Sequence, residues 1–333
     1  MRILITGGAG FIGSHVVKRF MAAGCQITLI DRLDSSSNMS RLAEIGCPHP
    51  RVRFVFHDLK APINEYVAKD IGHQDAVLHL AAGTHVDRSI QSPMSFVLDN
   101  VVGTCNLLDW ARTIPRIRVL YFSTDEVFGP APEGTAYREW DRYNSGNPYA
   151  ATKAGAEELT LAYANTYGLD AFITHTMNVI GPMQHWEKFV PLVIRKTMQG
   201  ETVTIHADAT RTKAGSRYYI HADDVAQALE FLVTSAVKGQ KYNIVGEREI
   251  NNLDLANMIA RAVGSPLIAE MTDFHSARPG HDLRYALDGS KMAAMGWAPS
   301  RSIEWAIEDI VAWYLANPKW MGMGNYPVDI VRR

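Results

Sequence analysis

The sequence predicts an α/β fold, a doubly wound parallel sheet followed by a smaller C-terminal α/β lobe. The N-terminal half alternates strand-like and helix-like runs, and the strand-like runs are nearly continuous Val, Ile, Leu and Phe. Continuous apolar strands are typical of a parallel sheet that is covered on both faces. Regular alternation of strands and helices is typical of the doubly wound arrangement. The pattern becomes less regular after residue 175, so we place the first domain at 1–175 and the smaller lobe at 176–333.

The elements follow one another along the first domain with short connections. The strand "RILIT" precedes a glycine loop and the helical run "FIGSHVVKRFMAAG", and a further helix is expected from residue 95 to residue 112. The next expected strands are "QITLID", "RVRFVFHDL", "DAVLHLAA" and "RVLYFST". In the second half, "AFITHT" is expected to return to the sheet, and "LDLANMIARAVG" and "SIEWAIEDIVAWYLAN" form amphipathic helices. The chain shows no repeat and no flexible linker, so the two lobes should pack together.

Composition excludes several classes of function. The 333 residues are 20% charged with a formal net charge of −2, which is ordinary for a globular protein and argues against nucleic acid as a partner. No apolar run approaches the ~20 residues of a membrane span, and we expect the first residues, "MRILITGG", to form a strand and not a signal peptide. Cys25, Cys47 and Cys105 are odd in number and scattered, without metal-like spacing. We therefore expect a cytoplasmic protein with reduced thiols, no metal and no membrane contact.

The glycine loop carries the fingerprint of a Rossmann dinucleotide site. Gly8-x-Gly10-x-x-Gly13, with Gly7 ahead of it, lies between a strand and a helix, where the helix N-terminus can meet a pyrophosphate. Asp31 ends the second strand, 18 residues after Gly13, where a carboxylate can accept hydrogen bonds from a ribose. That carboxylate favours NAD over NADP. Arg32 argues in the other direction, because arginine can pair with a 2′-phosphate.

Other strand ends extend the predicted NAD site. Asp58 follows the third strand and could reach the adenine, although it could equally be a solvated acid. Ala81 and Ala82 follow the fourth strand, where small side chains let a cofactor pass. The predicted cofactor-binding residues are Gly7, Gly10, Phe11, Ile12, Gly13, Asp31, Asp58, Leu59, Leu80, Ala81, Ala82, Tyr149 and Lys153.

Two short motifs point to catalysis. "YAATK" places Tyr149 and Lys153 four residues apart, one helical turn on one face. A neighbouring ammonium and a positive nicotinamide would lower the pKa of the tyrosine and make a phenolate available as a base. "STDEVFG" places Asp125 and Glu126 where an apolar strand should end, and carboxylates are seldom set beside a core unless they are used.

Together "TGGAGFIG", "STDEVFG" and "YAATK" resemble the extended short-chain dehydrogenase/reductase family. Thr124-Asp125-Glu126 resembles the nucleotide-sugar 4,6-dehydratase branch, of the dTDP-glucose type, and so do "EKFVPLVI", "RPGHDLRYALD" and "AWYLANPKWM". The resemblance implies a hydro-lyase of deoxysugar biosynthesis that converts an NDP-hexose to an NDP-4-keto-6-deoxyhexose with NAD regenerated. It assigns the C4 oxidation to Tyr149 with Thr124, the C5 base to Glu126 and the C6 acid to Asp125.

The resemblance also implies the substrate contacts and the assembly. The predicted substrate-binding residues are Thr84, Asn178, Glu187, Lys188, Arg217, Asn252, Arg278 and His281, with Arg211 and Lys213 as rivals to Arg217 for the diphosphate. The helix from residue 95 to 112 and the helix after Tyr149 resemble the pair that forms a four-helix homodimer interface in this family.

Several substitutions relative to the dTDP-glucose pattern leave the nucleotide open. Gly83-Thr84 replaces Glu-Ser, and Val179-Ile180 replaces Asn-Tyr, changes that we assign to the substrate lobe. "THVD" and "ATKAGAE" are shared with plant-type UDP-glucose 4,6-dehydratases, so UDP-glucose is the alternative substrate. A 4-epimerase or a sugar-acid decarboxylase would use the same NAD site, but the acid pair argues against the epimerase. A non-enzymatic NAD-sensing protein would have lost the tyrosine or the lysine.

Overall fold

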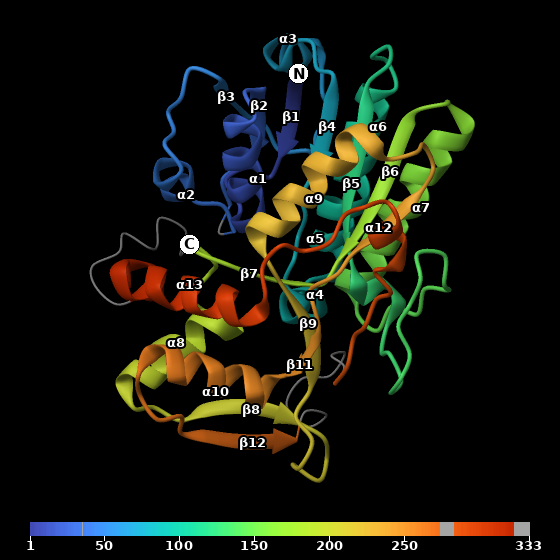
Figure 1. Ribbon diagram of the computed structural model, residues 1–333. Helices are drawn as coiled ribbons and strands as arrows, with labels where there is room; N and C mark the ends of the chain where they lie inside the picture. Colours follow the sequence, from blue (N-terminus) through green and yellow to red (C-terminus); the bar gives the residue numbers. More distant parts are fainter. Residues whose placement is uncertain (35, 274–282, 323–333) are drawn as a thin grey trace.

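The computed structural model describes residues 1–34, 36–273 and 283–322, and its centre is a parallel sheet of seven strands (Figure 1). The strand order is β10-β6-β5-β4-β1-β2-β3, and every neighbouring pair is parallel. This confirms the doubly wound α/β class, with the order reversing beside β1. The strands are β1 (Arg2–Thr6), β2 (Gln26–Asp31), β3 (Val52–Phe56), β4 (Ala76–His79), β5 (Arg118–Thr124), β6 (Asp170–Thr176) and β10 (Lys241–Ile244).

Helices cover both faces of this sheet, as the continuous apolar strands predict. Ile3 and Ile5 of β1 belong to the apolar cluster formed with α1 and α9, whereas Leu4 belongs to the cluster formed with α6 and α7. The alternation of side chains along a strand thus buries one strand against two helical layers. The helices of these layers are α1 (Phe11–Ala22), α2 (Met39–Glu44), α3 (Glu65–Ile71), α6 (Gly103–Ala111), α7 (Pro148–Thr166) and α9 (Ala222–Ser235).

The helix expected at residues 95–112 is present, but it is not a uniform α-helix. After α4 (Val86–Gln91), the chain forms α5 (Pro93–Phe96), the π-helical stretch η1 (Val97–Val102) and α6 without a break. Asn100 in η1 accepts a hydrogen bond from Gly83 N at 2.7 Å and donates to Thr152 Oγ1 of α7 at 2.9 Å. These contacts with distant segments hold the widened turn, which a local sequence pattern does not predict.

The second lobe lies beyond the carboxyl ends of the large sheet (Figure 1). It contains a three-stranded sheet in the order β11-β9-β7, a two-stranded sheet of β8 and β12, and helices that pack on them. Its elements are β7 (Asn178–Ile180), α8 (Phe189–Gln199), β8 (Val203–Ala207), β9 (Ser216–His221), β11 (Glu249–Asn251), α10 (Asn252–Val263), β12 (Ala269–Asp273), α13 (Ile303–Ala316) and the 3₁₀ turn η3 (Pro318–Met321). The short helix α12 (Ser290–Ala294) packs instead on β10 of the large sheet.

Both lobes share one apolar core, so they pack together as expected. The cluster around α1 and α9 continues through Ile194 of α8, Leu255 of α10 and Ile310 of α13, all fully buried. β6 joins the large sheet as the sequence predicts, and α9 and β10 also return to it from beyond residue 176. The division at residue 175 stays a prediction. Within the described residues, none of the helices combines the length and the apolar character that a membrane span requires.

Candidate active site

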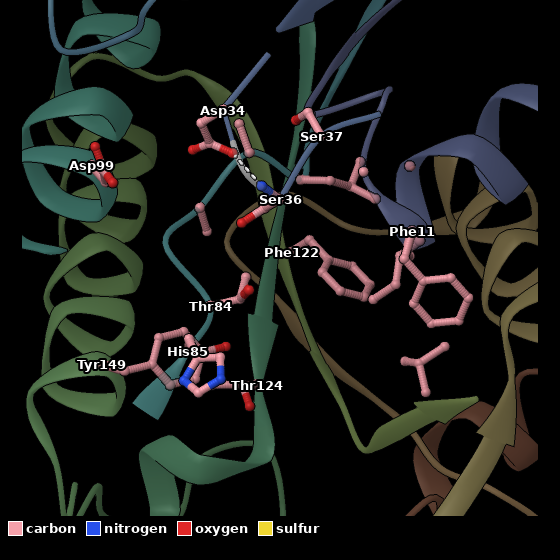
Figure 2. Close-up of a pocket in the computed structure, with 18 of the residues that line it drawn as sticks. Phe11, Asp34, Ser36, Ser37, Thr84, His85, Asp99, Phe122, Thr124 and Tyr149 are labelled. Atoms are coloured by element: carbon pink, nitrogen blue, oxygen red, sulfur yellow. Dashed lines mark hydrogen bonds between the residues drawn. The ribbon is translucent and has the colours of Figure 1, made fainter. Parts of the chain in front are cut away.

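A continuous cleft runs along the carboxyl ends of the strands, between the large sheet and the second lobe. Figure 2 shows Tyr149, His85 and Thr124 toward one end of it, with Asp34 and Ser36 toward the other. The cleft brings together every cofactor-binding residue that the sequence predicts, namely Gly7, Gly10, Phe11, Ile12, Gly13, Asp31, Asp58, Leu59, Leu80, Ala81, Ala82, Tyr149 and Lys153. This position, where the strand order reverses, is the one in which open α/β sheets bind ligands.

The glycine loop forms a cradle in which side chains cannot fit. Gly7 has φ +72°, and a Cβ on it would lie 2.8 Å from Ala81 N. A Cβ on Gly13 would lie 2.1 Å from Gly7 O, so the first turn of α1 packs directly on the loop. The N-terminus of α1 begins at Phe11 beside the cleft and can present N–H groups to a phosphate. The residues present therefore fit the pyrophosphate of a dinucleotide.

Asp31 ends β2, as predicted, and is buried at the base of the cleft. Its carboxylate accepts hydrogen bonds from Ala9 N at 3.1 Å, Leu33 N at 2.9 Å and Ser37 Oγ at 2.7 Å. These contacts fix the acid in place and keep its negative charge at this end of the cleft. A carboxylate here fits a ribose with free hydroxyls better than a phosphorylated one.

The motif Thr124-Asp125-Glu126 lies at the C-terminal end of β5. Thr124 is the last residue of β5 and caps the 3₁₀ turn η2 (Asp125–Phe128), its Oγ1 accepting a hydrogen bond from Glu126 N at 3.4 Å. The Thr124 hydroxyl also donates to Asp125 Oδ1 at 3.0 Å. Asp125 Oδ2 is buried and has no hydrogen-bond partner among the described residues. A buried carboxyl oxygen without a partner is costly, and it marks an atom that a bound ligand can satisfy.

Tyr149 and Lys153 lie on the first turns of α7, one turn apart as predicted. Asn147 caps this helix, its Oδ1 accepting from Ala150 N at 2.9 Å, and Pro148 occupies the first helical position. The Asn147 Nδ2 donates to Glu126 Oε2 at 3.1 Å, so the cap also positions an acid of the motif. Lys153 Nζ donates to the carbonyl of Phe122 at 2.7 Å.

Burial raises the pKa values of both acids of the motif. It raises the pKa of Asp125 to about 6, and burial together with the charge of Asp125 raises the pKa of Glu126 to about 7. The positive charge of Arg217 opposes both shifts, and that of Lys188 opposes the shift of Glu126. The pair can therefore hold one proton between two adjacent carboxyls near neutral pH, which suits acid–base work.

Burial also shifts the pKa values of Tyr149 and Lys153. Burial and the nearby charge of Glu126 raise the pKa of Tyr149 above its ordinary value in the free protein, with only a hydrogen bond to Thr124 acting against them. Burial lowers the pKa of Lys153 to about 7, and the charge of Glu157 opposes that shift. The lowering of the Tyr149 pKa by the ammonium and a bound nicotinamide stays a prediction for the complex with NAD.

The predicted substrate residues divide into four groups. Thr84, Asn178, Glu187 and Lys188 line the cleft. Arg217 acts on both acids through its charge, whereas its rival Arg211 is exposed and Lys213 pairs with Glu133 at 2.9 Å. Asn252 is not among the cleft-lining residues described, and its Oδ1 accepts from Tyr219 OH at 2.7 Å. Arg278 and His281 lie outside the described residues.

The structure corrects the location of one departure from the family pattern. Thr84 lies in the loop after β4, within the cleft near Tyr149 and not in the substrate lobe (Figure 2). Val179 lies on β7 in the second lobe, as expected, and lines the cleft from that side.

Two residues near the acids were missed from the sequence. His85 lines the cleft beside Thr84, and Asn147 couples the start of α7 to Glu126. For Asn147 a signal existed, because Asn followed by Pro is a common start of a helix. For His85 the only signal was its place just after the small residues that follow β4.

Comparison with known proteins identifies the family. Residues 3–245 match the model of the NAD dependent epimerase/dehydratase family. The chain is 38% identical to a dTDP-glucose 4,6-dehydratase of Streptomyces niveus (96% of this chain, 94% of that protein) and 35% identical to one of Escherichia coli (96% and 95%).

Solved structures agree. The crystal structure of DesIV, a dTDP-glucose 4,6-dehydratase of Streptomyces venezuelae with NAD and TYD bound, superposes with a TM-score of 0.89 at 34% identity, covering 99% of this chain and 100% of that chain. A UDP-glucose 4-epimerase of Thermus thermophilus in complex with NAD follows with a TM-score of 0.86 at 27% identity, covering 95% and 100%. The chain belongs to the extended short-chain dehydrogenase/reductases of the NAD dependent epimerase/dehydratase family, in the nucleotide-sugar 4,6-dehydratase branch.

Proposed function

We propose that the protein is an NAD-dependent dTDP-glucose 4,6-dehydratase, a hydro-lyase that gives dTDP-4-keto-6-deoxyglucose and water. The observation that carries the proposal is the Thr124-Asp125-Glu126 run at the end of β5, in the cleft that also holds Tyr149 and Lys153. Both fold matches bind NAD, and one of them is an epimerase, so the fold alone does not choose the reaction. The acid pair does, because an elimination needs a base and an acid on neighbouring atoms.

The first task of the site is to take a proton from the C4 hydroxyl. NAD, when bound, supplies the acceptor for the hydrogen that leaves C4 and returns it to C6 at the end of the cycle. Tyr149 takes the O4 proton, and Thr124, which hydrogen bonds to it, holds O4 and the phenol in line. The raised pKa of Tyr149 in the free protein means that a positive charge must be brought close before the phenolate is populated. Lys153 supplies one such charge when it is protonated.

The second task is the loss of water across C5 and C6. A ketone at C4 acidifies the C5 proton, Glu126 removes that proton, and Asp125 donates a proton to the departing O6. In the free protein burial raises the pKa values of both carboxyls toward neutrality, so the two can share one proton. The proposed roles require that proton to lie on Asp125 when substrate is bound. The unpartnered Oδ2 of Asp125 is the atom that O6 would engage.

The second lobe is proposed to hold the nucleotide and diphosphate. Asn178 begins β7, and Lys188 precedes α8, so both face the cleft from the lobe side. Arg217 of β9 is held by the carbonyls of Ser216 and Leu283 at 2.7 and 2.6 Å and stacks on Tyr285. A guanidinium fixed in this way is suited to a phosphate group. Asn252, Arg278 and His281 remain predicted substrate contacts.

The substrate is tested by incubating the protein separately with dTDP-glucose, UDP-glucose and GDP-mannose and detecting water loss by mass spectrometry. The proposal expects dehydration of dTDP-glucose in preference to the other two. Preference for UDP-glucose would keep the reaction and change the nucleotide, an alternative that the "THVD" and "ATKAGAE" stretches favour. Epimerisation without water loss, or loss of carbon dioxide from a sugar acid, would contradict the dehydratase. Absence of turnover with tight NAD binding would favour an NAD-sensing protein.

We also propose that two copies associate through a four-helix bundle built from α7 and the helical run that ends with α6. Met94 of α5 and Leu98 of η1 lie four residues apart on this run and are 66% and 40% exposed. Exposed apolar side chains at helical spacing are typical of a helix–helix interface. Met94→Glu should yield monomers in light scattering, whereas Val237→Glu, at another exposed apolar residue, should not. A dimer that persists in Met94→Glu would contradict this interface.

The proposed compartment is the cytoplasm. Cys25, Cys47 and Cys105 are all free thiols in the structure, and two of them are only partly buried. Free, accessible thiols are ordinary in a reducing compartment. A cytoplasmic location would also give the protein access to both NAD and its proposed nucleotide-sugar substrate.

A further inference from the structure

Arg32 occupies a position that should favour the wrong cofactor. It directly follows Asp31 and lines the adenosine end of the cleft. An arginine at this place in a dinucleotide fold commonly accommodates the 2′-phosphate of NADP. The chain nevertheless belongs to an NAD dependent family. Something in the site must therefore keep the guanidinium from a phosphate.

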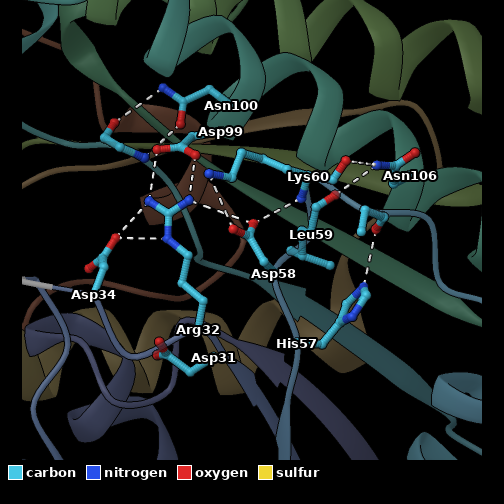
Figure 3. Close-up of polar contacts among 12 residues, drawn as sticks. Asp31, Arg32, Asp34, His57, Asp58, Leu59, Lys60, Asp99, Asn100 and Asn106 are labelled. Atoms are coloured by element: carbon cyan, nitrogen blue, oxygen red, sulfur yellow. Dashed lines mark hydrogen bonds and ion pairs between the residues drawn. The ribbon is translucent and has the colours of Figure 1, made fainter.

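The contacts of Arg32 account for its donors (Figure 3). Its Nε donates to Asp34 Oδ2 at 2.9 Å, and its Nη2 donates both to Asp34 Oδ2 at 2.6 Å and to Asp99 Oδ2 at 2.8 Å. Its Nη1 donates to Asp99 Oδ1 and lies 3.6 Å from Asp58 Oδ1. A guanidinium has five N–H donors, so four are engaged by two carboxylates and the fifth faces a third.

The charge around this group is negative even after Arg32 is counted. Asp31, Asp34, Asp58 and Asp99 supply four carboxylates, while Arg32 and Lys60, which pairs with Asp58 at 3.2 Å, supply two cations. Asp99 and Asp34 raise the pKa of the guanidinium, so it stays charged and bound to them. An added phosphate would carry about −1.5 to −2 near neutral pH. It would enter a field that is already repulsive and would have to displace a carboxylate.

Asp99 is far in the chain from Arg32 and reaches it from a different element. Asp31, Arg32 and Asp34 follow β2, whereas Asp99 lies in the π-helical stretch η1. The neighbouring Asn100 ties η1 to Gly83 and, through Thr152, to α7. The widened turn thus holds the Asp99 carboxylate where both of its oxygens accept hydrogen bonds from Arg32, a bidentate ion pair. Such a pair resists displacement more than a single contact would.

We propose that Asp99 is a specificity-determining residue, which engages Arg32 together with Asp34 and so makes the adenosine end of the cleft selective against a 2′-phosphate. Asp31 alone would disfavour the phosphate by repulsion. Asp99 does more, because it engages the guanidinium of Arg32, which could otherwise compensate for that repulsion.

The test measures cofactor binding and needs no sugar substrate. After removal of bound cofactor, NAD⁺ and NADP⁺ are titrated separately into the full chain by calorimetry at one fixed ionic strength. Asp99→Asn should lower the ratio of the NADP⁺ to the NAD⁺ dissociation constant about tenfold, the effect of one charge-assisted contact regained. Asp34→Asn should act in the same direction by releasing the other side of the guanidinium. Asp70→Asn removes a carboxylate from an exposed pair with Arg53 and should leave the ratio unchanged.

A double variant separates release of Arg32 from a simple loss of negative charge. In Arg32→Ala with Asp99→Asn the carboxylate is neutral but no guanidinium is available, so the gain in NADP⁺ binding should disappear. If the double variant keeps the gain, or if both Asp99→Asn and Asp34→Asn leave the ratio at its wild-type value, the proposal is overturned. Because dehydration is not measured, a wrong sugar substrate would leave this test unaffected.

Discussion

Replacing Glu157 by glutamine should destabilise the protein by about 3 kcal/mol, because it removes the charge at the centre of a buried polar network. Glu157 lies on α7 and is fully buried. It accepts hydrogen bonds from the hydroxyls of Ser123 and Tyr143 and from His175 Nε2 at 3.0 Å, and Lys241 Nζ lies 3.6 Å away. An amide of the same size keeps an acceptor oxygen, but it cannot accept from all of these donors or balance the ammonium of Lys241.

The magnitude follows from what is left behind. Removing one partner of a buried ion pair costs about 3–5 kcal/mol. The amide of glutamine still accepts a hydrogen bond, so we expect a cost at the lower end of that range. The free energy of unfolding is measured by urea denaturation at pH 7. Glu158→Gln changes the next residue, which is exposed, and serves as the matched control with an expected change within about 0.5 kcal/mol. Equal stabilities of the Glu157 and Glu158 variants would refute the reasoning.

The sign of the pH dependence gives a second check on the same variant. The donors around Glu157 lower its pKa in the folded protein, despite burial. The stabilisation is therefore complete above the unfolded pKa of about 4.3 and is lost as the pH falls through the lower folded value. The difference in the free energy of unfolding between wild type and Glu157→Gln should therefore decrease as the pH falls below the unfolded pKa of about 4.3. A difference that stays constant across this range would show that the carboxylate charge is not its source.

Glu157 also acts on Lys153, the proposed partner of Tyr149 in catalysis. Its negative charge opposes the lowering of the pKa of Lys153, which burial brings to about 7. Without that charge, Lys153 should lose its proton at a lower pH. The alkaline limb of the activity profile should then move toward acid in Glu157→Gln and stay in place in Glu158→Gln. A purely structural role for Glu157 would lower activity without moving this limb.

Three further outcomes test the proposed chemistry. Tyr149→Phe should slow both C4 oxidation and dehydration at least ~100-fold in single-turnover assays, and near wild-type rates would remove Tyr149 from the mechanism. Glu126→Gln should form a 4-keto sugar that retains O6 and does not exchange its C5 proton with deuterated water. Asp125→Asn should retain this exchange while the loss of water slows. Full dehydration by Glu126→Gln would contradict the assignment of Glu126 as the C5 base. Because the pKa values of the two acids are about 6 and 7, the kcat/KM profile should be highest between these values, and a flat profile would show that the pair does not titrate in the cycle.

Much of the fold could be predicted because its signals are local. A strand such as β1 places Ile3 and Ile5 on one face and Leu4 on the other, and all three are apolar, which is what two helical layers require. The π-helical stretch could not be predicted in this way. Its widened turn depends on Asn100 bonding to Gly83 and Thr152, which are 17 and 52 residues away in the chain.

The site was predictable to the extent that its residues form short motifs. Glycine loop, strand-end acid and helix-borne tyrosine each lie within one element, and the topology of a parallel sheet brings such ends to one edge. The partners of these residues are a different matter. From the sequence, Arg32 argued for a 2′-phosphate, yet Asp99, 67 residues later, engages its guanidinium. Asn252 stays a predicted substrate contact, and the hydrogen bond that its side chain accepts from Tyr219, 33 residues earlier, could not be predicted from the sequence.

Protonation was the least predictable property, because it depends on burial more than on sequence neighbours. The sequence predicts a lowered pKa for Tyr149 beside an ammonium and a bound nicotinamide, whereas in the free protein, without that cofactor charge, burial and the charge of Glu126 raise it. The same burial raises the pKa values of Asp125 and Glu126 toward neutrality and lowers that of Lys153. Burial thus raises the pKa values of the two carboxyls and lowers that of the ammonium, so that all three lie near 7. Adjacent positions at the end of β5 make the acid pair possible, but burial in the folded chain, together with the charge of one acid on the other, raises its pKa values.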